Sequence, residues 1–374
     1  MELELTSDQD LLRESAARFI DAVCPLAMVR GLVDSDRGRP ADYLRGAAEL
    51  GWFAMLVSEE HGGGTVSGQG LLDLALIAEE RGRGLQPGPF VSMNVVAAAL
   101  EVSGSTEQRG TVLPALCRGE LVATWVAGAA IGQGGPGSSI VETSTNHGFR
   151  LSGRAGLVQD GAAADWLLVT TDGPEGFSQF LVDATTPGIT VQPLRGHDIT
   201  QRLAAVSLDE VAVTASALVG ERGLARHDIE RQLQLACVLS TAETVGALDV
   251  LFDMTRAYAA DRTAFGRPIG SFQAVKHQLA DMSLSLECAK AMVVAATGAV
   301  QAERGDAGEI VSMAKSWVGD TGIDIVQGCF QVFGGIGYTW EHDLHLYLRR
   351  ITMNSLLFGQ ADWHRDRLCL IHGL

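Results

Sequence analysis

The sequence predicts an α+β fold in three parts: an N-terminal α-helical domain (residues 1–119), a middle antiparallel β domain (120–224) and a C-terminal four-helix bundle (225–374). Apolar residues recur at helical spacing in the first third of the chain, alternate with polar residues in the middle, and return to helical spacing in long segments afterwards. With 374 residues, the chain is also longer than a single hydrophobic core normally supports. Several packed modules in one body are therefore expected.

The first third is expected to be a helical bundle. Ser7 and Asp10 resemble a capping box that opens a helix, and the stretches 71–80 and 95–102 have the same apolar spacing. Period-two alternation predicts strands in the middle third at 149–153, 164–169 and 205–213. The last third predicts long helices over 228–260, 273–304, 308–333 and 342–357. Beyond these, Asp362, His364, Arg365 and Asp366 are expected to form a polar tail.

Composition restricts the function classes. A net charge of −17 argues against nucleic-acid binding, which depends on Lys and Arg to neutralise phosphates. The N-terminal segment MELELTSDQDLLRE has neither the basic nor the apolar region of a secretory signal, and no apolar run is expected to cross a bilayer. We therefore expect a cytoplasmic protein without membrane insertion. The 47% content of hydrophobic residues also predicts buried subunit interfaces.

Neither disulfide bonds nor metal sites are expected. The six cysteines are scattered without a CxxC pair, which is typical of buried free thiols in a reducing compartment. Glu341, His342 and His345 are ligand-type residues at helical spacing. A helix-surface cluster is the preferred interpretation of these three residues, and no metal is expected.

The segment RTAFGRPIGSFQAVKHQLADM, residues 262–282, places an arginine at the end of one helix and an amide at the start of the next. The guanidinium of Arg262 has the fork geometry that binds a diphosphate, and the ring of Phe265 could cover an adenine or a ribose. A helix-turn-helix whose arginine forms a surface ion pair is an equal alternative on the residues alone.

The segment QVFGGIGYTWEHDLHLYLRR, residues 331–350, has two adjacent glycines that let a ligand approach the backbone. It does not match the dinucleotide-binding fingerprint, because a helix rather than a strand is expected before it. Arg349 and Arg350 are either countercharges for an anionic cofactor or members of ordinary salt bridges.

These two segments, in this order and at this separation, resemble the C-terminal signatures of the acyl-CoA dehydrogenase family, and the α, β, α order is similar to that family over essentially the whole chain. The stretch EEHGGG at 59–64 also resembles the family's N-terminal domain. Its HGGG part could be a lipase oxyanion loop, but the chain has no GxSxG nucleophile motif. The resemblance implies the acyl-CoA dehydrogenase fold and FAD as the cofactor.

The resemblance further implies that FAD is shared across a subunit interface, with its ADP half held by the neighbouring subunit. Arg262 would then face the pyrophosphate, and Phe265 the adenosine. The residues implied to bind the cofactor are Arg262, Phe265, Gln273, Gln331, Gly334 and Gly335.

The catalytic base of the family is missing at both positions where the resemblance would place it. Family members remove the α-proton of an acyl thioester with a glutamate while hydride passes to the flavin. In most members this glutamate precedes a glycine and follows the second signature; counting from Arg349 places Phe358 there, before Gly359. In a minority it lies on an earlier helix; counting back from Arg262 gives Ala236. No catalytic residue is therefore expected in this chain.

Glu230 and Glu243, about two turns from Ala236 on the same expected helix, are the remaining candidates for a relocated base. An exposed helical glutamate is usually only a solvated charge, and this is the preferred interpretation of both.

The residues that would hold the flavin ring are also changed. The family's TEPGAGSD-like loop reads VAGAAIGQGG here, at 126–135, and its Trp-x-Thr reads Gly156, Leu157 and Val158. Glycine in place of tryptophan removes stacking area, and valine in place of threonine removes a hydrogen-bond donor.

This one-sided loss resembles the base-less subunit of heteromeric, α2β2 acyl-CoA dehydrogenases of bacterial steroid side-chain degradation. It implies a homologous partner subunit, an acyl-CoA substrate, for which a steroid side-chain thioester is an analogy, and electron-transfer flavoprotein as electron acceptor. Two alternatives stay open: a homomeric flavoprotein with a relocated base or a different reaction, and a non-catalytic scaffold.

Overall fold

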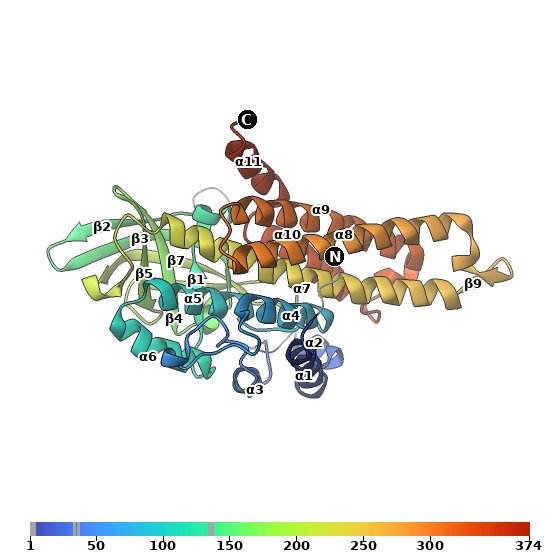
Figure 1. The fold of residues 1–374 in the computed structure, drawn as a ribbon, viewed down its shortest axis with the longest axis horizontal. Coiled ribbons are helices and arrows are strands. Elements are labelled where there is room, and N and C mark those ends of the chain that lie inside the picture. Colours follow the sequence, from blue (N-terminus) through green and yellow to red (C-terminus); the bar gives the residue numbers. More distant parts are fainter. Residues whose placement is uncertain (1–4, 33–34, 36–37, 134–137) are drawn as a thin grey trace.

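The computed structural model describes residues 5–32, 35, 38–133 and 138–374. Helices come first along the chain, then two small sheets, and then long helices (Figure 1). The predicted order of helical, β and helical parts is confirmed. The change in secondary structure falls between Cys117, the last residue of the sixth helix, and Ala123, the first residue of a strand.

The N-terminal part is a bundle of helices: α1 (Ser7–Val23), α2 (Leu26–Gly31), α3 (Tyr43–Glu49), α4 (Gly70–Arg83), α5 (Phe90–Ser103) and α6 (Thr106–Cys117). The capping box of α1 lies one residue earlier than predicted. The Thr6 hydroxyl accepts a hydrogen bond from the Gln9 amide, and the Gln9 side chain accepts one from the Thr6 amide. Threonine and glutamine at this spacing satisfy two otherwise free donors at the helix start.

The middle part contains two four-stranded sheets. One has the order β1 (Ala123–Val126), β4 (Trp166–Gly173), β5 (Gly176–Asp183) and β8 (Leu218–Val219). The other has the order β2 (Ile140–Thr145), β3 (Gly148–Gln159), β7 (Leu203–Val213) and β6 (Ile189–Leu194). Strands β1 and β4 pair in parallel, so the expectation of a wholly antiparallel domain is wrong at this edge. The chain crosses into the second sheet between them and returns in the same direction.

The C-terminal part consists of α7 (Arg226–Asp261), α8 (Gln273–Gln301), α9 (Ala307–Phe333), α10 (Leu344–Leu356) and α11 (Ala361–Ile371). Helices α7 to α10 form the predicted bundle. Three residues of the predicted polar tail, Asp362, Arg365 and Asp366, are exposed. The tail forms α11, which packs on α9 and projects from the body (Figure 1). Its His364 is fully buried.

Two helices, α7 and α8, are long and apolar enough by composition to span a membrane, contrary to expectation. Core helices of globular proteins pass the same test, and 83% of the apolar window of α7 is buried inside the protein. In α8 only 39% of that window is buried, and Leu284 is exposed. Helix α8 thus has an apolar face that the described residues of this chain leave largely uncovered.

A buried ion-pair network joins the three parts of the chain. The Arg350 guanidinium on α10 is 3.0 Å from the Asp198 carboxylate, which precedes β7, and 3.8 Å from the Glu243 carboxylate on α7. Glu243 is also 3.2 Å from Arg81 on α4. All four side chains are almost fully buried. Arg350 is therefore a structural ion-pair residue, which decides between the two interpretations given for it.

All six cysteines are free thiols, as predicted. Their expected burial holds for four of them. Cys288 is half-buried and Cys369 is exposed.

Candidate functional site

The first predicted motif lies at the tip of the long α7–α8 hairpin, far from the β domain (Figure 1). Helix α7 ends when Arg262 takes an extended conformation, and the short strands β9 (Thr263–Ala264) and β10 (Arg267–Pro268) follow. The turn between them consists of Phe265 and Gly266, with φ values of 53° and 78°. Two positive φ values in a two-residue hairpin turn match the right-handed twist of its strands. The side chain of Arg262 is exposed.

Phe265 is placed unfavourably for an isolated chain. Its side chain is 95% exposed, and its backbone is in the left-handed region, which bulky side chains rarely adopt. It has one ring contact, an edge-to-face approach to Phe272 with centroids 6.2 Å apart. Backbone strain of this kind persists where it serves function. An aromatic ring held out from a hairpin tip is suited to stack on a planar group.

The other predicted cofactor residues are exposed at the same end of the bundle. Gln273 is the first residue of α8, Gln331 is in the last turn of α9, and Gly334 follows as the C-cap of α9. Stacking of Tyr258 on Phe333, at 4.4 Å between ring centroids, ties the ends of α7 and α9 together.

The glycines after α9 leave the backbone open. A Cβ atom built on Gly334 or Gly335 would meet no atom of the chain within 4 Å. Gly334 has a φ of 64°, so its own conformation favours glycine, whereas Gly335 has no such requirement. The open space around both is what a ligand lying against the backbone needs.

The two positions expected for the base are both buried, and a neighbour of one contacts the other. Ala236 is fully buried on α7, and the Sγ atom of its neighbour Cys237 is 3.6 Å from the Phe358 carbonyl oxygen. Phe358 itself is 5% exposed, with a φ of 59°. Phe358 therefore lies beside the residue that follows Ala236 on α7. Neither expected position has a carboxylate.

The flavin-ring segments converge on the same place. Gly156 and Leu157 form a β-bulge between β3 and β7, and Leu157 has a φ of 56°. The Gln133 side-chain amide donates to the Leu157 carbonyl at 2.8 Å and accepts from the Phe358 amide at 2.8 Å. Gln133 belongs to the altered loop at 126–135, of which residues 134 and 135 lie outside the described part of the chain. Val158 is 1% exposed in the small core of the β domain.

Glu230 and Glu243 are both held by arginines. Glu243 is almost fully buried between Arg81 and Arg350, so the expectation of a solvated charge is wrong for it. Glu230 accepts a hydrogen bond from Arg367 at 2.8 Å. Burial works to raise the pKa of Glu230, but the hydrogen bond and charge of Arg367 outweigh it, and this pKa is lowered. A base for a weak carbon acid needs the opposite shift.

Burial lowers the pKa of two basic groups in this region, His364 and Lys315. Burial lowers the pKa of His364 to about 3. The neutral ring can donate from Nε2 to the Phe358 carbonyl at 2.9 Å and accept at Nδ1 from the Ser312 hydroxyl at 3.2 Å. Burial also lowers the pKa of Lys315 to about 8, and its amino group donates to the Asn354 carbonyl at 2.6 Å. Neither group replaces a carboxylate base.

No metal site is formed by groups of His, Cys, Asp or Glu among the described residues. His342 accepts a hydrogen bond from the Leu344 amide at Nδ1, and the ring of His345 stacks on Trp340. The His345 Nε2 atom is 3.1 Å from the Trp340 carbonyl oxygen. His345 is buried, so the cluster lies partly inside the helix packing and not wholly on its surface.

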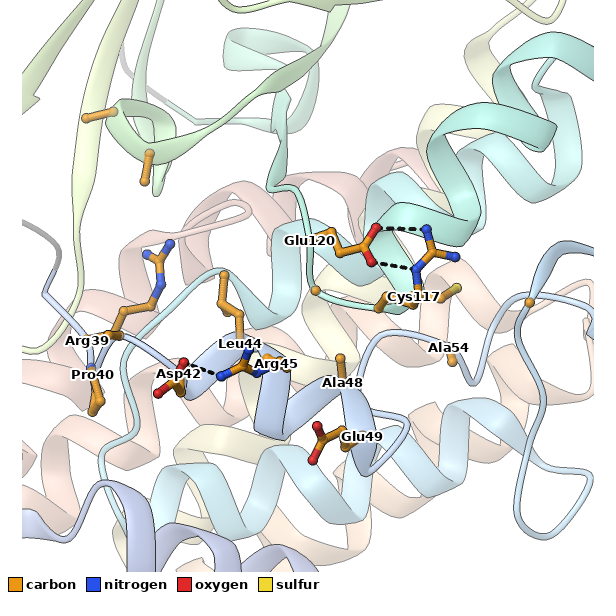
Figure 2. Close-up of a pocket in the computed structure, with 16 residues that line it drawn as sticks. Arg39, Pro40, Asp42, Leu44, Arg45, Ala48, Glu49, Ala54, Cys117 and Glu120 are labelled. Carbon is orange, nitrogen blue, oxygen red and sulfur yellow. Dashed lines mark hydrogen bonds and ion pairs between the residues drawn. The ribbon is translucent and has the colours of Figure 1, made fainter.

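A cavity of about 930 Å³ lies elsewhere, between α3, the end of α6 and residues 162–163 (Figure 2). Figure 2 shows two ion pairs at its wall, Arg45 with Asp42 and Arg118 with Glu120. It is lined by none of the six predicted cofactor residues and by neither expected base position. Its size alone therefore does not identify it as the site of chemistry.

Two family models match the chain: the acyl-CoA dehydrogenase N-terminal domain over residues 6–120, and the acyl-CoA dehydrogenase C-terminal domain over residues 221–369. Together they cover most of its length. The chain belongs to the acyl-CoA dehydrogenase family.

Among the relatives in this family, acyl-CoA dehydrogenase FadE34 of Mycobacterium tuberculosis is 35% identical over 373 residues, which cover 97% of this chain and 47% of FadE34. The chain thus spans about half of FadE34. Two solved structures are similar over nearly their whole lengths. A chain of the ChsE4-ChsE5 complex from Mycobacterium tuberculosis has a TM-score of 0.90 and 26% identity to this chain. The match covers 100% of this chain and 99% of the other. A variant of the Tcur3481-Tcur3483 steroid ACAD has a TM-score of 0.87 and 27% identity, with 98% of each chain covered.

Gln133 and Trp363 are residues at this acyl-CoA dehydrogenase site that the sequence did not single out. The Trp363 ring packs against the Gly132 and Gly359 backbones, where an added Cβ would be only 2.6 and 2.5 Å from it. The positive φ of both glycines is a consequence of these tight turns. A glutamine inside a loop carries no sequence signal for two hydrogen bonds to distant segments, so only the fold reveals them.

Proposed function

We propose that this acyl-CoA dehydrogenase chain is one subunit of a heteromeric, FAD-dependent enzyme. It completes the ADP side of the FAD site of a homologous partner, and the partner supplies the flavin-ring contacts and the catalytic glutamate. The observation that carries the proposal is an asymmetry. The residues for a neighbour's cofactor are exposed and open, whereas the positions for the chain's own flavin ring are tied by Gln133 to Phe358, and both base positions are buried and lack a carboxylate.

The exposed end of the bundle fits an adenosine diphosphate group. Arg262 offers a planar cation for the pyrophosphate, Phe265 an exposed ring for the adenosine, and Gly334 and Gly335 an open backbone. A bulky ring in left-handed backbone conformation is disfavoured in the free chain, so a partner for that ring is the simplest reason for its position. When bound, FAD would supply the hydride acceptor for α,β-dehydrogenation.

The half-site where this chain would hold its own flavin ring, formed by Gln133, residues 156–158 and Phe358, does not fit that ring. The Gln133 side chain is hydrogen-bonded to both Leu157 and Phe358 where the ring and the base would be, and Gly156 provides no stacking surface. No step of the reaction is therefore assigned to this side of the chain. Catalysis depends on the site that the partner contributes.

A homologous acyl-CoA dehydrogenase subunit is the proposed partner, in an α2β2 assembly. The names of the two similar structures, ChsE4-ChsE5 and Tcur3481-Tcur3483, each contain two components. FadE34 is about twice as long as the segment that matches this chain, which leaves room for a second unit of similar length. The uncovered apolar face of α8 supports assembly, because large exposed apolar patches usually mark interaction sites.

The proposed substrate is an acyl-CoA thioester. The description of Tcur3481-Tcur3483 as a steroid ACAD favours a steroid side-chain thioester as its acyl group. Electron-transfer flavoprotein is the proposed electron acceptor, and the cytoplasm the proposed location.

The test is co-expression with a homologous acyl-CoA dehydrogenase that retains the glutamate and the flavin-ring residues. We expect the two chains to co-purify with bound FAD and to oxidise an acyl-CoA, and this chain alone to bind no FAD. Arg262→Ala should lower the flavin content of the complex. Arg256→Ala is the matched control, because Arg256 is exposed on the same helix and pairs only with the nearby Asp253 among the described ion pairs.

A second variant separates cofactor contact from folding. Gly335→Leu adds a side chain where the free chain has open space, so its thermal stability should be unchanged while the flavin content of the complex falls. Unchanged flavin content in both Arg262→Ala and Gly335→Leu would contradict the proposal and favour a scaffold. A flavin-containing chain that is active without a partner would favour the homomeric alternative.

A further inference from the structure

Gln133 connects three segments that are far apart in the sequence. Its side-chain nitrogen donates to the carbonyl of Leu157 in the β3 bulge, at 2.8 Å. Its side-chain oxygen accepts from the amide of Phe358, which lies between α10 and α11, at 2.8 Å. The Gln133 side chain is almost fully buried. One primary amide thus satisfies the buried amide of Phe358 and the carbonyl of the partly buried Leu157.

The two backbone groups it satisfies belong to the segments where the family resemblance places the flavin ring and the base. Leu157 and Phe358 have positive φ values, so each is held in a turn that takes its backbone groups out of regular secondary structure. A buried donor or acceptor without a partner is costly, because it loses its hydrogen bonds to water. A site that retained these turns but lost its ligand would need an internal replacement.

The packing around Gln133 closes the same site. The Trp363 ring lies against Gly132 on one side and Gly359 on the other, the residues adjacent to Gln133 and Phe358. The Phe358 carbonyl is also taken, since it accepts from the His364 ring at 2.9 Å. Both peptide groups of Phe358 are therefore fixed by side chains of this chain.

We infer that Gln133 is a built-in replacement for a ligand, a positioning residue whose amide holds the Leu157 bulge and the Phe358 turn together and keeps this half-site closed. The half-site is then not an empty pocket that has lost a few contacts. It is a closed structural unit that folds without a cofactor. This inference deepens the proposed function, on which its meaning rests, but its test needs neither the partner nor an activity assay.

The test reads the hydrogen exchange of a single amide in the full chain. Labelling of the phenylalanine amides with ¹⁵N gives a spectrum of 12 residues, in which Phe358→Leu identifies the Phe358 signal. Gln133→Met keeps the length of the side chain but removes the acceptor, so exchange at Phe358 should accelerate about tenfold or more. Gln133→Glu keeps the acceptor, so the Phe358 amide should stay protected.

The matched control is Gln179→Met in β5. Gln179 is also a buried glutamine with two side-chain partners, Thr170 and Gln232. Its replacement should destabilise the chain without selective loss of protection at Phe358. The inference is overturned if Phe358 stays protected in Gln133→Met, or if Gln179→Met exposes it equally.

Addition of FAD to the wild-type chain separates this inference from the proposed function. A closed half-site predicts no change in the Phe358 signal, and displacement of the signal by FAD would overturn it. If instead the partner complex lacks flavin while the Phe358 amide remains held by Gln133, the proposed function fails and the closed half-site stands.

Discussion

Phe265 is the residue whose conformation is hardest to explain in a free chain. An asparagine tolerates left-handed backbone better than a phenylalanine does, and the exposed ring buries almost nothing. Phe265→Asn should therefore leave the free energy of unfolding of the isolated chain unchanged or raise it by about 1 kcal/mol. The same variant should lower the flavin content of the partner complex. Chemical denaturation and flavin absorbance measure the two effects, and a parallel loss of both would contradict a binding role.

The buried imidazole of His364 predicts how stability depends on pH. Burial lowers its pKa to about 3 in the folded chain, against an ordinary value of 6.5. Between these values the unfolded chain binds a proton that the folded chain does not, so stability falls as the pH decreases below 6.5. The loss contributed by one such group is at most about 1.4 kcal/mol per pH unit.

His364→Gln tests this dependence, because glutamine can still donate to the Phe358 carbonyl but does not titrate. Urea denaturation at pH 7.5, 6.5, 5.5 and 4.5 should show a shallower loss of stability in the variant than in the wild type. Identical slopes for the two proteins would mean that His364 is protonated in the folded chain. Carboxylates titrate in both proteins and cancel in the comparison.

Single residues were predictable from the sequence where an aligned motif contained them. Arg262 and Phe265 are exposed at a hairpin tip, and Cys237, the neighbour of Ala236, contacts Phe358, while the roles assigned to these residues stay predictions. The burial of Glu243 was not predictable, because its arginine partners come from α4 and α10. Long-range pairs depend on the packing of elements and leave no local pattern.

At the scale of elements, the long helices and the alternating strands were predictable because their apolar periods are strong. The helical conformation of the polar tail was not predicted, and the helix buries His364, a residue type that is usually more exposed. The parallel β1–β4 pair depends on a connection through the other sheet. Neither a weakly apolar helix nor strand direction can be derived from local periodicity.

The contact of α11 with the loop after β1 should depend on the absence of a side chain at Gly132. A Cβ there would lie 2.6 Å from the Trp363 ring, and the φ of 66° is itself unfavourable for alanine. Gly132→Ala should lower the free energy of unfolding by about 3 kcal/mol, from a clash added to strain. Gly68→Ala, with a φ of 78° but open space, should lose only about 1 kcal/mol.

A double-mutant cycle identifies the clash as the cause. Combining Gly132→Ala with Trp363→Ala removes the ring, so the glycine substitution should cost less in that background than in the wild type. Additive losses in thermal denaturation would show that Trp363 does not limit the space at residue 132.

At the scale of the whole molecule, the stability of Glu243 variants tests whether Glu243 has a structural role. It is buried between Arg81 and Arg350 and thereby links α4, α7 and α10. Glu243→Gln removes the carboxylate partner of the buried Arg81 and one of the two carboxylates near Arg350, which keeps Asp198, and should lower the free energy of unfolding by about 3 kcal/mol. Glu230→Gln breaks a half-exposed pair with Arg367 and should cost about 1 kcal/mol or less.

The same two variants test the relocated base within the partner complex. If both glutamates are structural, each variant complex should retain its rate of acyl-CoA oxidation at temperatures where it remains folded, because the proton is removed by the partner's glutamate. A relocated base predicts instead a large loss of kcat in one variant, out of proportion to its loss of stability. Rates measured alongside circular dichroism separate the two outcomes, since only a catalytic glutamate lowers the rate of a fully folded complex.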